Sequence, residues 1–256
     1  MSIQFNESDW KRISETYRKW WNGELERPLF NVWITGCDPG REEPRIARRH
    51  RTAQYPDEVS AEEIVDRWDY ELSCRRYPGD SFPVVWPDFG PGALAAFLGA
   101  RPHVDDNTVW FHAPGEIEIQ DLHFRYNEQH PWVKRIDSII QAANRRWGGN
   151  VLISTTDLGG TLDVLQSFRP GEGLLLDLYD QPDEVKRVTN EIHEAWWKYF
   201  WHFAEVAQTG KVNRGYSAWT VIYSEDHYYM LQCDFAYTIS PAMFDEFVKP
   251  ELARSC

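Results

Sequence analysis

The sequence predicts an α/β fold built as a (β/α) barrel. Short β-rich segments alternate along the chain with segments whose apolar residues recur at helical spacing. This alternation implies a mostly parallel sheet, which either closes into a barrel or lies open with helices on both faces. No candidate strand is followed by Gly-x-Gly-x-x-Gly, the pattern of dinucleotide-binding open sheets. The barrel is therefore the favoured architecture.

The first 100 residues supply two candidate strands and two helices. Residues 10–21 are expected to form an amphipathic helix, and the β-rich residues 28–36 a first strand that ends at glycine. A second helix is expected over residues 60–72. Residues 82–86 then form a short buried strand, and its Pro- and Gly-rich exit loop carries Asp88.

The middle of the chain predicts a hairpin, a helix and a third strand. Residues 108–112 and 116–124 alternate enough to form a hairpin over one end of the fold. Residues 132–147 have helical spacing and end before two glycines. Residues 151–155 form the third strand, with Asp157 at its exit.

The clearest helix covers residues 182–206, where apolar side chains recur at spacings of three and four. Pro182 lies in the first turn of this helix, and Asp180 is expected to cap it. Two more strands are expected at residues 217–223 and 229–233. These two bring the number of expected strands to about five. Ser240 is the expected N-cap of the last helix.

Composition limits the class of protein and its partners. The 256 residues predict a single domain over 1–256, and a formal net charge of -13 repels polyanions. No nucleic-acid partner is expected, and the basic residues 45–51 are interpreted as a solvated helix face. Polar residues interrupt the start of the chain, and no run approaches about 18 apolar residues. A cytoplasmic protein that does not bind membranes is expected.

Cysteine and tryptophan usage adds two further expectations. The 4 cysteines form no Cys-x-x-Cys pair, so neither a disulfide framework nor a local zinc site is indicated, and a reducing compartment fits best. The 13 tryptophans either fill a core or line a pocket that stacks on a planar or sugar-like ligand, and core packing is the favoured interpretation.

Candidate functional residues lie where strands end. In a parallel barrel, the side chains at the carboxyl ends of the strands face the active site. This rule selects the polar residues Cys37, Asp88, His112, Asp157, Arg169 and Asp234. Asp88 and Asp234 could bind a pyrrole-type N–H or a cationic group. They could also act as an acid and base pair if burial and mutual repulsion separate their pKa values.

Each of these residues also has a structural interpretation. Asp88 could cap a loop, Asp157 could form a turn, and Asp234 could cap the helix that follows it. Cys37 could bind a metal or attack an electrophile, although a lone cysteine is more often inert. His112 lies beside an aromatic residue and is expected to be packed and hydrogen-bonded.

Three segments, in matching order, resemble the uroporphyrinogen decarboxylase superfamily, which also contains cobalamin-dependent methyltransferases. They are residues 80–99 (DSFPVVWPDFGPGALAAFLG), 159–185 and 231–252. The resemblance implies a TIM (β/α)8 barrel of the uroporphyrinogen decarboxylase-like type. It also places Asp88 at the acidic position of the family's active site, and Asp234 where members carry Asp or Ser. The substrate-binding candidates are then Cys37, Arg41, Trp86, His112, Asp157, Arg169 and Tyr237.

Departures from the family pattern are equally informative. The decarboxylases carry an arginine-rich loop after the first strand, whereas only Arg41 could serve here, and Leu165 replaces their tyrosine. Residues resembling the zinc ligands of the methyltransferases are not found in this chain. About five strands cannot close a barrel of eight. The chain is therefore expected to be a C-terminally truncated barrel, or to be completed by a partner, with an exposed sheet edge that favours association.

Three functions follow. The first is a methyltransferase-type enzyme that acts on a small molecule with a corrinoid or thiol methyl carrier. The residues themselves do not identify a cofactor; the resemblance allows a corrinoid and zinc as cofactors, without zinc ligands in this chain, and a corrinoid protein as a partner. The second is a cofactor-free decarboxylase of a porphyrinogen or other polycarboxylate, with Asp88 stabilising the intermediate. The third is a noncatalytic small-molecule-binding protein, and a homodimer is compatible with all three.

Overall fold

The computed structural model describes residues 3–209 and 214–256. The helices are α1 (Glu7–Trp21), α2 (Ala61–Ser73), α3 (Leu94–Phe97), α4 (Pro131–Trp147), α5 (Thr161–Phe168), α6 (Gly173–Asp180), α7 (Pro182–Gln208), α8 (Pro241–Phe247) and α9 (Lys249–Ser255). Short 3-10 helices cover Thr52–Gln54 (η1), Ile119–Asp121 (η2) and Asp234–Thr238 (η3). The strands are β1 (Val84–Val85), β2 (Arg101–Val104), β3 (Val109–His112), β4 (Leu152–Ile153), β5 (Tyr216–Ser217) and β6 (Tyr223–Ser224).

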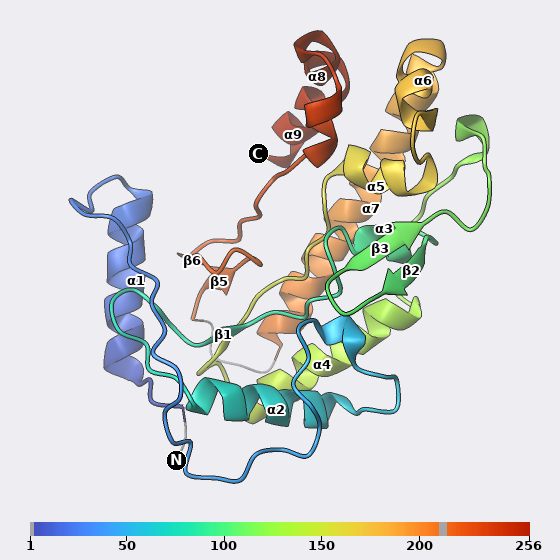
Figure 1. The fold of residues 1–256 in the computed structure, drawn as a ribbon. Coiled ribbons are helices and arrows are strands. Elements are labelled where there is room, and N and C mark those ends of the chain that lie inside the picture. Colours follow the sequence, from blue (N-terminus) through green and yellow to red (C-terminus); the bar gives the residue numbers. More distant parts are fainter. Residues whose placement is uncertain (1–2, 210–213) are drawn as a thin grey trace.

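The centre of the fold is the parallel pair β1 and β4, in which Val84 faces Leu152. The Ser154 N–H donates to the Val85 carbonyl at 2.8 Å and extends this ladder. β5 lies beside β4, and β5 and β6 form an antiparallel pair. Around the strands, α2 packs on α4, α4 on α7 and α7 on α5 (Figure 1). The described residues are thus a mixture of helices and short strands.

A closed barrel is not formed by the residues that the structure describes, whose strands make three two-stranded sheets. The first expected strand, residues 28–36, pairs only through isolated bridges from Asn31 to Gly79 and from Ile34 to Arg76. Phe30 in this segment is 55% exposed. The strand expected at 229–233 is absent, since residues 229–233 belong to no strand. Sequence periodicity predicted too much strand here because pairing depends on neighbours that are distant in the chain.

The hairpin differs from the expected one. β3 lies where a strand was expected, but it pairs with β2 rather than with residues 116–124, which contain η2. β2 has the sequence Arg-Pro-His-Val and is exposed along its length. It therefore lacks the apolar alternation that reveals a strand in a sequence.

The long helices agree with the sequence predictions to within a few residues. Ser60 caps α2, and its hydroxyl accepts the backbone N–H of Glu63. Ser240 caps α8 in the same way. The expected cap of α7 was wrong: Asp180 is the last residue of α6, and Gln181 is the N-cap without a side-chain hydrogen bond. The short gap between the two helices leaves no room for the predicted cap.

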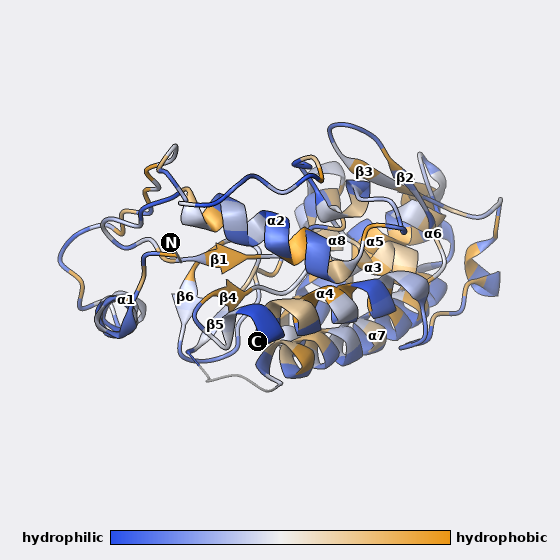
Figure 2. Ribbon diagram, turned by 90° about the horizontal axis from the view of Figure 1, so that it is seen from below, coloured by the Kyte–Doolittle hydropathy of each residue, from blue (hydrophilic) through white to orange (hydrophobic). Residues whose placement is uncertain are grey.

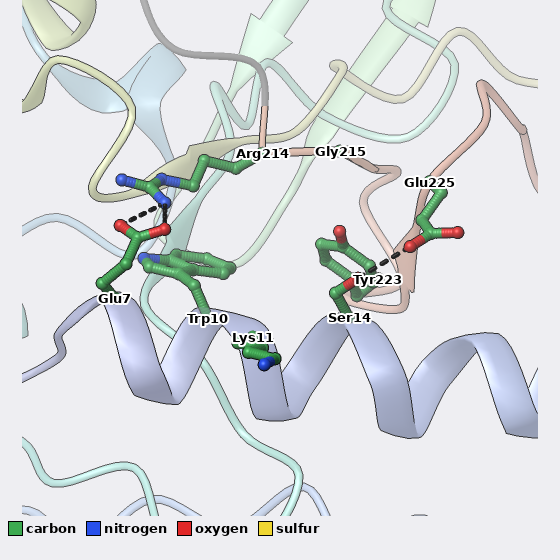
Figure 3. A pocket seen from close by; sticks show the side chains of 8 residues that line it. All are labelled: Glu7, Trp10, Lys11, Ser14, Arg214, Gly215, Tyr223 and Glu225. Atoms are coloured by element: carbon green, nitrogen blue, oxygen red, sulfur yellow. Dashed lines mark hydrogen bonds and ion pairs between the residues drawn. The ribbon is translucent and has the colours of Figure 1, made fainter.

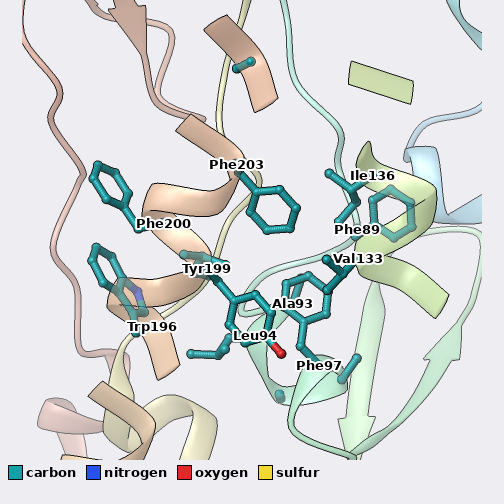
Figure 4. Close-up of a cluster of buried hydrophobic side chains, with 14 of the residues drawn as sticks. Phe89, Ala93, Leu94, Phe97, Val133, Ile136, Trp196, Tyr199, Phe200 and Phe203 are labelled. Carbon is teal, nitrogen blue, oxygen red and sulfur yellow. The ribbon is translucent and has the colours of Figure 1, made fainter. Parts of the chain in front are cut away.

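The apolar face of α7 forms much of the core. Tyr199 and Phe203 on this helix pack against Phe97, with ring centres 5.1 and 5.9 Å apart (Figure 4). The apolar residues of α4 and α7 face the interior, whereas their polar residues lie outside (Figure 2). Across the described ranges, 3–209 and 214–256, no helix is sufficiently long and apolar to cross a membrane.

Core packing accounts for part of the tryptophans. Among the described residues, Trp10 and Trp196 are buried, and the partly buried Trp68, Trp132, Trp147 and Trp197 pack against the core. Trp21, Trp33, Trp110 and Trp201 are exposed, so the interpretation of tryptophan as core filler does not hold for these positions. Exposed aromatic rings remain available to line cavities.

Candidate functional site

The loops that follow β1 and β4 meet at one end of this parallel pair. The Ala93 N–H donates to the Asp157 carbonyl at 2.8 Å. A Cβ atom at Gly159 would lie 2.7 Å from the Cα of Gly92, so the two backbones approach too closely for a side chain. The parallel pairing delivers both carboxyl ends to the same side. The loops carrying Asp88 and Asp157 are therefore neighbours.

Asp88 is buried and held by an arginine. The Arg51 guanidinium lies 3.1 and 2.9 Å from the two carboxylate oxygens, and the Gly90 N–H donates to one of them at 3.0 Å. The Asp88 N–H in turn donates to the Thr52 hydroxyl. Residues 45–51 were expected to form a solvated helix face; five of these seven residues are exposed, but the segment is a loop, and Arg51 pairs with Asp88. Asp88 does cap its own loop through Gly90, and it also forms this ion pair.

A cavity of about 360 Å³ opens beside Asp88. We call it the Asp88 cavity, and its lining includes Trp33, Arg48, Arg49, Arg75, Trp86 and Asp88. The Arg75 guanidinium lies 5.1 Å from the centre of the Trp33 ring, within the range of a cation–π contact. Val221 also lines the cavity and has a φ of 57°, a conformation that is rare for a β-branched residue. The cavity is thus aromatic and rich in arginine.

Asp157 anchors the loop after β4. One of its oxygens accepts hydrogen bonds from the Gly159 N–H at 2.9 Å, the Tyr229 hydroxyl at 3.1 Å and the Gln232 amide at 3.2 Å. Burial raises the pKa of Asp157, and the nearby charge of Asp88 adds to the rise. The turn expected at Asp157 is present. The same carboxylate also ties residues 229–232 to the ends of β1 and β4.

Three hydroxyls directly after β4 lack partners. The side-chain oxygens of Ser154, Thr155 and Thr156 are buried and form no hydrogen bond within residues 3–209 and 214–256. Buried hydroxyls nearly always have a partner, which solvent or a ligand can supply. This end of β4 is therefore polar in the way that a binding site requires.

A second cavity, also of about 360 Å³, lies beside Asp234. We call it the Asp234 cavity, and its lining includes Trp110, Phe111, Asp163, Gln166, Gln232 and Asp234. The Asp163 carboxylate accepts the backbone N–H groups of Asp234 at 3.0 Å and Phe235 at 2.7 Å. Burial raises the pKa of Asp163, and the charge of Asp234 contributes. Asp234 does not cap α8, since Ser240 does.

The structure separates the remaining candidates from these cavities. Arg41 is paired with Asp66 at 2.7 Å and Asp69 at 3.1 Å. Arg169 donates to both oxygens of Asp177, at 2.6 and 2.9 Å. Both arginines thus have structural partners.

Three other candidates are found at the surface. Cys37 is a partly exposed free thiol, and His112 lies on the exposed side of β3. Tyr237 is 95% exposed. Among the described residues, the linings of the Asp88 and Asp234 cavities do not include the candidates Arg41, Arg169, Cys37, His112 and Tyr237. Their predicted roles in substrate binding stay predictions.

Sequence reasoning missed Arg51 and the arginines of the Asp88 cavity. Arg48, Arg49 and Arg51 belong to the basic run after the first candidate strand, which was a usable signal. Nothing in the sequence shows that this run folds back on the loop after β1. Arg51 and Asp88, which meet there, are 37 residues apart in the chain. The missing information is the tertiary contact.

A third cavity, of about 380 Å³, lies between α1 and β6 (Figure 3). Arg214 donates to both oxygens of Glu7 at 2.6 Å, and the Ser14 hydroxyl donates to Glu225 at 2.7 Å. Lys11, which also lines the cavity, lies 3.9 Å from Glu15 outside it. None of the predicted site residues lines it in the described part of the chain. Its contacts attach α1 to the strands.

The zinc of the related methyltransferases does not fit the described residues. Within 3–209 and 214–256, no group of three or more His, Cys, Asp or Glu side chains is arranged to hold a metal ion. Zinc sites in proteins need three or four such ligands. No mechanistic step is therefore assigned to zinc.

Comparison with known proteins identifies a related fold. No protein-family profile matches the sequence, and no curated protein matches it. A solved structure, a methyltransferase from Methanosarcina mazei, is similar with a TM-score of 0.50 and 13% identity over 67% of this chain and 47% of that chain. The match thus spans less than half the length of the methyltransferase. At this identity the likeness concerns the fold, and the described fold is similar to part of a methyltransferase fold.

Proposed function

We propose that the protein is an enzyme of the uroporphyrinogen decarboxylase-like type that transfers a methyl group between a small molecule and a corrinoid or thiol carrier. The observation that carries this proposal is the fold likeness to a methyltransferase. The order of the three resembling sequence segments supports the same family. A corrinoid would supply the methyl carrier, and we assign it to a partner protein.

The residues of this chain are proposed to bind and orient the small molecule at the carboxyl ends of β1 and β4. The Asp88–Arg51 pair fixes a carboxylate at the wall of an aromatic cavity, where it can accept a hydrogen bond from substrate. Asp234 is the second proposed acid or base, because it is exposed at the other cavity. The buried loops around Asp157 hold the two segments in place.

The test is a methyl-transfer assay with methylcobalamin as donor and a simple thiol as acceptor, in which the thioether product is measured. Asp88→Asn is expected to lower the rate at least tenfold, because the amide keeps the shape and loses the charge. Asp180→Asn, at the exposed end of α6, is the matched control. Transfer that is unchanged in Asp88→Asn would contradict the assignment, and circular dichroism checks that each variant folds.

Decarboxylation is the second candidate, and the arginines of the Asp88 cavity favour it. Arg49 and Arg75 line this cavity, and guanidinium groups bind carboxylates with two parallel hydrogen bonds. Release of labelled carbon dioxide from an aromatic polycarboxylate, lost in Arg75→Gln, would support this reaction. Saturable binding without turnover in either assay would instead support the noncatalytic binding protein.

A further inference from the structure

The Asp234 cavity has a composition opposite to that of the Asp88 cavity. It lies between the β2–β3 hairpin, both ends of α5 and the segment that precedes η3. Among the described residues that line it, none is Lys, Arg or His, and the charged side chains are Asp163 and Asp234. Its volume of about 360 Å³ falls in the range of small-molecule sites.

Within residues 3–209 and 214–256, neither carboxylate in this cavity has a cationic partner. Asp163 accepts the backbone N–H groups of Asp234 and Phe235, and a backbone hydrogen bond at Gly160 also stabilises its charged form. The Asp234 side chain is exposed and forms no ion pair with another residue of 3–209 or 214–256. The mutual repulsion of the two acids contributes to the raised pKa of Asp163, after burial. A cation placed between them would relieve this repulsion.

Trp110 on β3 forms part of the cavity wall, and its side chain is 58% exposed, although tryptophan is highly buried on average. Phe111, the next residue of β3, also lines the cavity and packs against Trp132 with ring centres 6.3 Å apart. The face of an indole ring attracts cations, most strongly ammonium groups that carry little hydration. Cation–π attraction by the indole ring and charge attraction by the two carboxylates therefore both favour an organic cation.

We propose that the Asp234 cavity binds a small organic ammonium ion, with its charge near Asp163 and Asp234 and its apolar part against Trp110. This binding goes beyond the proposed methyl transfer; Asp234 is also the second proposed acid or base, but the binding does not require that role. A neutral ligand of the same shape would leave the two carboxylates uncompensated. The two carboxylates would repel an anion, which the arginine-rich Asp88 cavity is better suited to bind.

Isothermal titration of the full chain with choline tests the proposal, and 3,3-dimethylbutan-1-ol is the neutral molecule of matching shape. We expect saturable choline binding at least about tenfold tighter than binding of the alcohol, since the charge contributes about 1.4 kcal/mol or more. Asp234→Asn should weaken choline binding about fivefold, and Trp110→Leu should also weaken it. Asp180→Asn, an exposed acid outside the cavity, should leave it unchanged.

Equal binding of choline and the alcohol, no saturable binding of choline, or an unchanged affinity in Asp234→Asn would each overturn the proposal. Nα-acetyl-lysine amide presents an ammonium group on a protein-like side chain. Tighter binding of this compound than of choline would also overturn it, because the ligand would then be a lysine of a partner protein. Asp234 and Trp110 are exposed, so both variants are expected to fold. Because the readout is binding, failure of the methyl-transfer assay leaves this test intact.

Discussion

Replacing Gly159 by alanine should separate the two loops that form the candidate site. Gly159 has a φ of +76°, and an added Cβ would lie 2.7 Å from the Cα of Gly92. The contacted atom belongs to the backbone and cannot rotate away as a side chain would. Gly171 is the matched control, since its φ is +65° and a Cβ there would meet nothing within 4 Å.

The two variants differ in one physical effect. A left-handed conformation costs an alanine about 1–2 kcal/mol, and Gly171→Ala should lose about this much stability. Gly159→Ala should lose an additional amount of about 1–3 kcal/mol, because the loops after β1 and β4 must move apart. We therefore expect a total loss of about 2–5 kcal/mol at Gly159.

Equilibrium urea unfolding, followed by circular dichroism, measures this difference. For a chain of this length each kcal/mol lowers the melting temperature by about 2–4 °C, so thermal unfolding provides a second measurement. Equal losses in Gly159→Ala and Gly171→Ala would refute the close approach of the two loops. A larger loss at Gly159 that leaves choline binding unchanged would show that the Asp234 cavity tolerates the displacement.

Three further predictions concern the core, an ion pair and pH. Phe203→Ala in the core should cost about 3–5 kcal/mol in urea unfolding, whereas Trp201→Ala, at an exposed position of α7, should change stability by less than about 1 kcal/mol. Arg169→Met should lower the free energy of unfolding by about 3–5 kcal/mol, because it leaves the buried Asp177 carboxylate unpaired. Adding Asp177→Leu to the same chain should recover much of this loss. No recovery would argue against a stabilising Arg169–Asp177 pair. Burial raises the pKa of Asp157 in the folded state, so its contribution to stability is present below the ordinary carboxyl pKa and is lost as the pH rises through the raised value. Asp157→Asn should therefore reduce the fall in stability with rising pH above about pH 4, and an unchanged slope would contradict the raised pKa.

The candidate site was only partly predictable. Asp88, Asp157 and Asp234 were selected because polar residues follow candidate strands, and the structure places them at or beside two cavities. Asp88 and Asp234 line different cavities. Their joint action in one site stays a prediction. Arg169 was selected by the strand-end rule, and Arg41 by resemblance to the arginine-rich loop of the decarboxylases. Their partners, acids on α2 and α6, are set by helix packing and could not be read from spacing.

The sequence by itself determined the long helices α1, α2, α4 and α7, because helix formation depends on local periodicity, caps and glycine stops within a few residues. Only the tertiary structure decided how the strands pair and which arginine meets Asp88. Both depend on contacts between residues far apart in the chain, as in the 37-residue separation of Arg51 and Asp88. Short strands such as β2 carry little local signal, since their partners supply the hydrogen bonds that define them. The same reason explains why the sequence did not show that this largely solvated cationic run also supplies the arginine that holds Asp88.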